Sequence, residues 1–269
     1  MNERSILETG TVDVIAVTDD LWSVRTLIVN VCFVGAGKNG EWVLIDTGIG
    51  PFTNALIQEA EQRFHRPPVC IILTHGHFDH VGSVLELADR WKVPVYAHAA
   101  ELPYLTGKQD YPPADPSVGG GIMAGVSPLY PHQAIDLGER VNTLPADGHV
   151  PGLPEWRWIA TPGHSPGHIS LYRERDGCLI AGDAFITVKQ ESALAVLSQK
   201  IELHGPPMYF TTDWEEARGS VQALAALSPK TAVTGHGQPI SGEELRLGLQ
   251  RLADHFDEVA VPQQGKYVD

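Results

Sequence analysis

The sequence predicts an α/β fold, and three observations support that prediction. The 269 residues, 43% of them hydrophobic, are enough to bury a substantial core. Stretches rich in β-branched and aromatic residues occupy 12–17, 24–35 and 42–46. From Pro51 onward, segments with a helical spacing of apolar residues alternate with short, continuous apolar runs. This alternation is typical of sheets covered by helices.

The three N-terminal stretches are expected to form an antiparallel meander. The second and third are separated by residues 36–40, whose Asn-Gly pair favours a tight turn. A helix is then predicted to start near Pro51 and to end before Pro67-Pro68, because proline suits a first turn and interrupts a helix interior.

The next elements alternate between strand and helix. Residues 69–73 are five consecutive apolar residues, which indicate a strand buried on both faces. Apolar positions between Val81 and Ala88 predict a second helix, and 93–98 predicts another short strand.

The segment 103–154 differs in composition, because it holds nine of the twenty prolines and a Gly-Gly-Gly run. We therefore expect one domain, 1–269, in which this segment is an insertion or a lid over a substrate site. The alternative is a surface excursion without a function.

Strand patterns resume at 156–161, 169–174 and 178–182, and a further strand is predicted at 231–234. Thr212-Asp213-Trp214-Glu215 and Ser241-Gly242-Glu243-Glu244 both fit a helix N-cap, Thr212 or Ser241, with a glutamate three positions on. The last helix is expected to end near Val259.

The charge balance narrows the classes of function. Lys plus Arg is 19 and Asp plus Glu is 33, which gives a net charge of −14 that would repel nucleic-acid phosphates. The sequence contains no signal-peptide core and no run of about 18 apolar residues. Three separated cysteines favour reduced core thiols. We expect a cytoplasmic protein that acts on a small molecule, without nucleic-acid or membrane partners, and that could form homo-oligomers.

The strongest motif follows the strand predicted at 69–73. It reads Thr74-His75-Gly76-His77-Phe78-Asp79-His80. Imidazole and carboxylate groups suit zinc, iron or manganese, and a turn after a strand leaves the backbone free to aim them at one or two ions. The alternative is a histidine-rich surface loop, which would not ordinarily follow a fully apolar strand.

Three further candidates lie at the ends of later predicted strands, where α/β proteins gather their sites. They are His164 in Thr161-Pro-Gly-His-Ser-Pro-Gly-His168, Asp183 after 178–182, and His236 in Gly-His-Gly after 231–234. Each alone is a weak signal, because a single histidine after a strand is more often a hydrogen-bonded turn residue.

Together these motifs resemble the metallo-β-lactamase superfamily, from Asp46-Thr47-Gly48 to His236. The resemblance implies a four-layer αββα sandwich with a two-metal site at one edge of the sheets. It implies that His75, His77 and His164 bind one ion, that Asp79, His80 and His236 bind the other, and that Asp183 bridges them. It assigns His168 a structural hydrogen bond and Asp46 the orientation of a ligand histidine. The remaining histidines match no family motif and are expected to be exposed.

The resemblance further implies a hydrolase that uses two divalent ions, zinc in the first place, with iron or manganese as alternatives. A metal-bridging hydroxide held by Asp79 would attack the carbonyl of an ester, lactone or thioester. Asp183 disfavours a β-lactamase, which generally has serine or cysteine there. The alternative is a mononuclear iron oxygenase that acts on a persulfide.

Substrate choice is expected to reside in 103–154 and 190–212. The second segment carries Met208, Tyr209 and Phe210, and such residues favour mostly apolar pockets. The region near the C-terminus lacks a basic cluster to bind a glutathione carboxylate. We therefore expect a preference for a neutral or weakly polar substrate with an apolar acyl or ring portion over highly anionic substrates.

Overall fold

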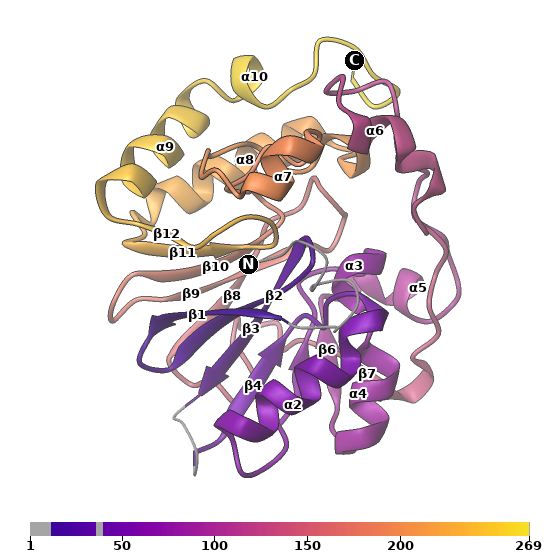
Figure 1. Ribbon diagram of the computed structural model, residues 1–269, viewed down its shortest axis with the longest axis vertical. Coiled ribbons are helices and arrows are strands. Elements are labelled where there is room, and N and C mark those ends of the chain that lie inside the picture. The colour runs from indigo at the N-terminus through magenta and orange to yellow at the C-terminus, as the bar shows by residue number, and fades with distance from the viewer. Residues whose placement is uncertain (1–11, 36–39, 269) are drawn as a thin grey trace.

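Two β-sheets pack face to face, and helices cover the outer face of each sheet (Figure 1). This computed structural model describes residues 12–35 and 40–268. The arrangement is the αββα sandwich that the sequence predicts. The turn expected at residues 36–40 lies almost wholly outside the described residues.

The first sheet has seven strands in chain order. β1 to β4 are antiparallel neighbours, whereas β4 to β7 pair in parallel. Their bounds are β1 (Asp13–Thr18), β2 (Leu21–Thr26), β3 (Val29–Gly35), β4 (Trp42–Ile45), β5 (Ile71–Ile72), β6 (Val95–Ala97) and β7 (Val141–Thr143).

The second sheet has five strands in the order β12-β11-β10-β9-β8. Only the β10–β11 pair is parallel. The strands are β8 (Trp156–Ala160), β9 (Ile169–Arg173), β10 (Cys178–Gly182), β11 (Thr231–Thr234) and β12 (Ile240–Ser241).

Two longer helices cover each sheet. The first sheet packs against α2 (Thr53–Arg63) and α4 (Val84–Trp91), and the second against α8 (Trp214–Ala226) and α9 (Gly242–Asp254). The short helices are η1 (Gly50–Phe52), α3 (Phe78–Val81), η2 (Ala99–Glu101), α5 (Leu102–Leu105), α6 (Ile122–Val126), η3 (Ser127–Leu129), η4 (Gly138–Arg140), α7 (Ala193–Ser198), η5 (Met208–Phe210) and α10 (Phe256–Val259).

The layers enclose three apolar clusters. One lies between the sheets and includes Val43, Ile72 and Ile180. The other two lie between each sheet and its helices, with Leu44 and Leu56 in the first and Leu179 and Val221 in the second. Burial on both faces explains why β4, β5 and β10 are apolar at every position.

Two predictions about elements need correction. The stretch 24–35 is not one strand, because the chain reverses at Leu27, whose φ is 65°. The helix expected between Val81 and Ala88 is two helices, α3 and α4.

Within the segment 103–154, β7 belongs to the first sheet, and Val150 and Leu153 lie in the cluster between the sheets. None of the helices in residues 12–35 and 40–268 has the length and apolar character needed to cross a bilayer.

Candidate metal centre

The seven predicted ligand residues come together at one edge of the two sheets. The chain after β5 and the short helix α3 supply four of them, and the loop between β8 and β9 supplies the fifth. Asp183 directly follows β10, and His236 lies two residues after the end of β11. All seven side chains are buried: His75, His77, Asp79, His80, His164, Asp183 and His236.

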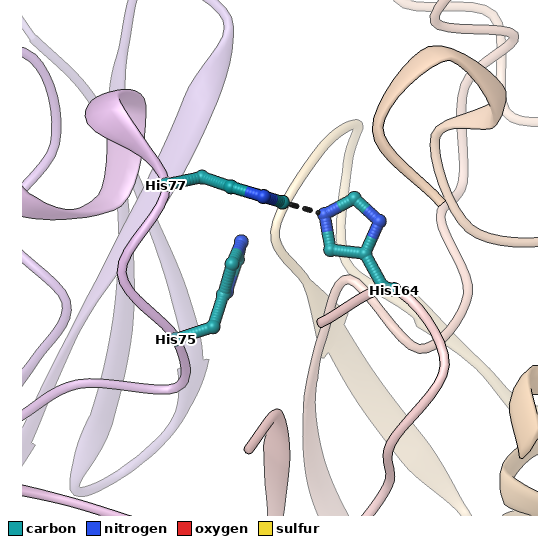
Figure 2. Close-up of side chains that lie close together, drawn as sticks. All are labelled: His75, His77 and His164. Atoms are coloured by element: carbon teal, nitrogen blue, oxygen red, sulfur yellow. Dashed lines mark hydrogen bonds between the residues drawn. The ribbon is translucent and has the colours of Figure 1, made fainter. Parts of the chain in front are cut away.

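The first group consists of His75, His77 and His164, whose rings point toward one another (Figure 2). Nδ1 of His77 lies 2.9 Å from Nε2 of His164. The ring centroid of His75 lies 4.6 Å from that of His77 and 5.0 Å from that of His164. Three converging imidazoles of this kind can hold one metal ion.

The second group consists of Asp79, His80 and His236. Nε2 of His236 lies 3.5 Å from Oδ2 of Asp79. The ring of His236 meets that of His80 edge to face, with centroids 5.7 Å apart. One carboxylate and two imidazoles provide a second set of metal ligands.

Asp183 lies between the two groups. Its Oδ2 is 3.4 Å from Nε2 of His164 and 4.0 Å from Nε2 of His75 in the first group. The same oxygen is 3.5 Å from Nε2 of His80 and 3.2 Å from Nε2 of His236 in the second. A single carboxylate therefore reaches both sets of ligands.

The polar atoms at this site fit bound metal. Nε2 of His75, Nε2 of His80 and Oδ1 of Asp183 are buried without a hydrogen-bond partner, which is costly unless a ligand satisfies them. At zinc-ligand bonds near 2.1 Å, two ligands of a tetrahedral ion lie about 3.4 Å apart. The separations around Asp183 are close to that value.

In three of the predicted ligand histidines, His80, His236 and His164, ring nitrogen Nδ1 lies beside an oxygen atom. Asp46 Oδ2 accepts a hydrogen bond from Nδ1 of His80 at 2.8 Å, as the resemblance implied. The carbonyl oxygen of Ile28 lies 2.7 Å from Nδ1 of His236, and Oγ1 of Thr211 lies 3.1 Å from Nδ1 of His164. Partners of this kind orient the rings and fix which nitrogen faces the metal.

The first group favours neutral imidazoles. Burial lowers the pKa of His75 and His164 well below the ordinary value, and it lowers the pKa of His77 to about 3. A neutral imidazole offers the lone pair that a metal requires.

In the second group, the pKa values of the histidines shift in the opposite direction. Burial lowers the pKa of His80 and His236, but the nearby carboxylates of Asp183 and Asp79 outweigh it and raise both values. Burial likewise raises the pKa of Asp183, but His236 and His80 outweigh it and hold the value well below the usual range. Protons and metal therefore compete for this group.

His168 has a structural role, as the sequence predicts. Its Nε2 accepts a hydrogen bond from the backbone N–H of Asp183 at 2.8 Å, and its Nδ1 lies 3.1 Å from the carbonyl oxygen of Thr161. His168 thereby joins two of the loops that supply ligands. The expectation that the other histidines are exposed holds for His65, His149 and His255 but is wrong for three that are partly buried: His98, His132 and His204.

Sequence reasoning missed Glu101, a fully buried carboxylate that joins two ligand loops. Its Oε2 accepts hydrogen bonds from the N–H of Gly76, at 3.0 Å, and from the Tyr111 hydroxyl. Its Oε1 accepts from the Ser165 hydroxyl at 2.7 Å and from the N–H of Gly167 at 2.8 Å. No motif marks Glu101, because its partners in the two ligand loops lie 25, 64 and 66 residues away.

Asn30 is the second missed residue. Its Nδ2 donates to the carbonyl oxygens of Thr234 and Gly237, at 2.9 and 2.6 Å, and so holds the loop that carries His236. The signal was present in the sequence, because Asn30 is the one amide side chain in the otherwise apolar β3.

An aromatic cluster borders the first group of ligands. The ring of Phe210 stacks on His77 with centroids 4.8 Å apart, and Phe78 and Tyr130 lie 6.3 Å from Phe210. Ala124 belongs to the same cluster. The segments 103–154 and 190–212, which the sequence associates with substrate choice, therefore meet beside the metal centre.

A family model described as the metallo-beta-lactamase superfamily matches residues 24–236. "Probable metallo-hydrolase YflN" of Bacillus subtilis is 50% identical over 235 residues, which are 86% of this chain and 89% of that protein. A protein named hydroxyacylglutathione hydrolase from Acidiphilium cryptum is 29% identical over 70% of this chain and 55% of its own length. The crystal structure of TTHA1623 in a di-iron-bound form has 25% identity and a TM-score of 0.53, and the match covers 83% of this chain and 96% of that one.

Proposed function

The chain belongs to the metallo-beta-lactamase superfamily, and from this premise we propose that it is a dinuclear hydrolase of esters, lactones or thioesters. The observation that carries the proposal is the position of Asp183 Oδ2, within 3.2–4.0 Å of histidines from both groups. A mononuclear site would not need one carboxylate to face two complete sets of ligands.

The residues have distinct roles in this proposal. His75, His77 and His164 would hold one divalent ion, Asp79, His80 and His236 the other, and Asp183 both. Two divalent ions polarise a carbonyl and lower the pKa of a shared water toward ~7. Zinc is the first candidate for the metal, and the di-iron form of TTHA1623 makes iron a serious second one.

Asp79 is the proposed catalytic residue. Its carboxylate faces His236 and is nearly buried. In that position it can accept a proton of the attacking water and orient the water toward the carbonyl carbon. This role needs neither a serine nor a cysteine nucleophile.

The proposed substrate class rests on the chemistry of two metal ions and on the similarity to a named relative. Two ions beside one carboxylate suit attack on a carbonyl, and the similarity to a protein named hydroxyacylglutathione hydrolase supports thioesters among the candidates. We propose a small-molecule substrate. Iron-dependent persulfide oxidation is the alternative that the test must separate.

The test is an activity panel on the metal-loaded protein. We expect hydrolysis of an ester, a lactone or a thioester, loss of activity with a chelator, and no oxygen consumption with a persulfide. Asp79→Asn should reduce turnover on the order of 10²–10⁴-fold with only partial loss of metal.

Two results would contradict the proposal. Oxygen consumption with a persulfide and no hydrolysis would favour the oxygenase. Turnover per bound metal that stays near wild type in Asp79→Asn would remove the role assigned to this residue.

A further inference from the structure

Five exposed apolar side chains gather on two short segments near the metal centre. Ile122, Val126 and Leu129 lie on α6 and η3, and Leu194 and Leu197 lie on α7. We call these five residues the apolar rim. Four of them are 72–83% exposed, whereas no other large apolar side chain among the described residues exceeds 53%.

The two segments of the rim touch through their backbones. The N–H of Met123 donates to the carbonyl oxygen of Glu191 at 3.3 Å. A Cβ at Gly121 would lie 1.8 Å from that same oxygen, so the close approach requires glycine. The two segments that carry the rim therefore lie side by side where Gly121 and Met123 meet Glu191.

An apolar path leads from the rim to a predicted metal ligand. Met123, which lies beside Ile122, has its Sδ 3.7 Å from the hydroxyl of Tyr130. The ring of Tyr130 lies 6.3 Å from that of Phe210, which stacks on His77. Met123 and Tyr130 are only partly buried, so this path reaches the surface.

The rim carries no charge, although the chain has a net charge of −14. Residues 116–135 and 192–199 contain no Asp, Glu, Lys or Arg. An uncharged apolar surface favours hydrocarbon over anionic or strongly polar groups.

We propose that the apolar rim binds an extended hydrocarbon chain of the substrate while the reacting carbonyl lies at the metal centre. This inference rests on the proposed function and adds a substrate class to it: an ester, lactone or thioester with a long, neutral acyl chain. The apolar path favours this occupant, because a bilayer or a second copy of the protein would cover the rim without any need for contact with His77.

The experiment compares esters of one alcohol with straight acyl chains from acetyl to dodecanoyl. Burial of one methylene contributes enough free energy for up to about a fourfold gain in binding. We expect kcat/KM to rise about two- to fourfold per methylene over part of the series. Leu129→Ser combined with Leu197→Ser should abolish that rise and leave hydrolysis of the acetyl ester and the metal content unchanged.

Leu247→Ser is the matched control, because Leu247 is exposed on α9 and lies outside the rim. It should keep the wild-type dependence on chain length. Binding of 1-decanol, measured by calorimetry, reports on the rim without hydrolysis, and it should weaken at least tenfold in the double variant only.

The outcomes distinguish a failure of the proposed hydrolase function from a failure of the proposed hydrocarbon site at the rim. If no carbonyl substrate is hydrolysed but decanol binding still depends on Leu129 and Leu197, the proposed function fails and the rim remains a hydrocarbon site. If hydrolysis occurs but neither chain length nor the double variant matters, the rim proposal is wrong. A dimer that the double variant dissociates, or rim-dependent binding to phosphatidylcholine vesicles without a chain-length effect, would also overturn it.

Discussion

Glu101 is not one of the proposed metal ligands, but it joins the two loops that supply the first group of ligands. Its carboxylate accepts hydrogen bonds from the loop of His75 and His77 and from the loop of His164. It thus fixes the distance between ligands that the chain supplies far apart. We regard Glu101 as a positioning residue.

Glu101→Gln should weaken metal binding about 10–100-fold, as expected for residues that hold ligands in place. Glutamine offers one acceptor oxygen and one NH2 group, so some of the four donors would face another donor. Competition with a chromophoric chelator measures the effect. Glu61→Gln, which changes an exposed carboxylate, is the control. Equal metal affinity in both variants would show that Glu101 serves the fold alone.

Among single residues, the sequence predicts a site residue wherever that residue lies in a short motif after a strand. The seven predicted ligands come together because strand ends share one edge of the sheets. Glu101 and Asn30 were not predicted, because a hydrogen bond between distant segments leaves no local pattern in the sequence. Asn30 could have been suspected from its place in an apolar strand.

Among the elements, the hairpin of β2 and β3 was not predicted, because its turn gives no local signal in the sequence. Thr26, Leu27 and Ile28 reverse the chain, with the N–H of Ile28 donating to the carbonyl oxygen of Thr26 at 2.9 Å. None of these residues is a typical turn former. Packing of β2 and β3 in the sheet overrides the local preference, and the carbonyl oxygen of Ile28 then meets His236.

The predicted helix starts provide a controlled test, although the N-cap of α8 is Asp213 and not the predicted Thr212. The side chain of Asp213 accepts a hydrogen bond from the N–H of Glu216 at 2.9 Å, whereas Ser241 occupies the N-cap of α9 without such a bond. Asp213→Ala should lower the free energy of unfolding by about 1 kcal/mol, and Ser241→Ala by a few tenths. Urea unfolding measures both. A larger loss for Ser241→Ala would refute this assignment.

At the scale of the whole molecule, Arg173 ties the two sheets together at the end opposite the metal centre. Its side chain is 1% exposed, and its guanidinium binds Asp20, next to β2, and Asp176, in the turn before β10. It also lies over the ring of Trp156, 4.7 Å from the centroid. The sequence could not predict this contact, because Asp20 and Arg173 lie 153 residues apart.

Arg173→Met should lower the free energy of unfolding by about 2–3 kcal/mol, because it removes the buried counter-charge of Asp20 and Asp176 and leaves them only the exposed Arg175. Both carboxylates are partly exposed, and this limits the loss. Arg175→Met is the control: its guanidinium is 51% exposed, so a change within about 0.5 kcal/mol is expected. Similar losses in the two variants would contradict the role of Arg173.

The same variant should change the response to acid. Burial raises the pKa of Asp20, but hydrogen bonds from Arg173 and Thr18 outweigh it and hold the value below 3.8. A carboxyl group with a lowered folded-state pKa stabilises the fold fully above its ordinary pKa, and this contribution is lost as the pH falls through the lowered value. Below about pH 4, the wild type should therefore lose more stability than Arg173→Met.

We propose that one chain holds two metal ions at one edge of the two sheets. Elemental analysis of protein purified without chelators tests it most directly. We predict about two ions per chain, loss of mainly one in His236→Ala, and weaker binding of both in Asp183→Ala. A single iron per chain that His236→Ala leaves undisturbed would contradict the dinuclear account.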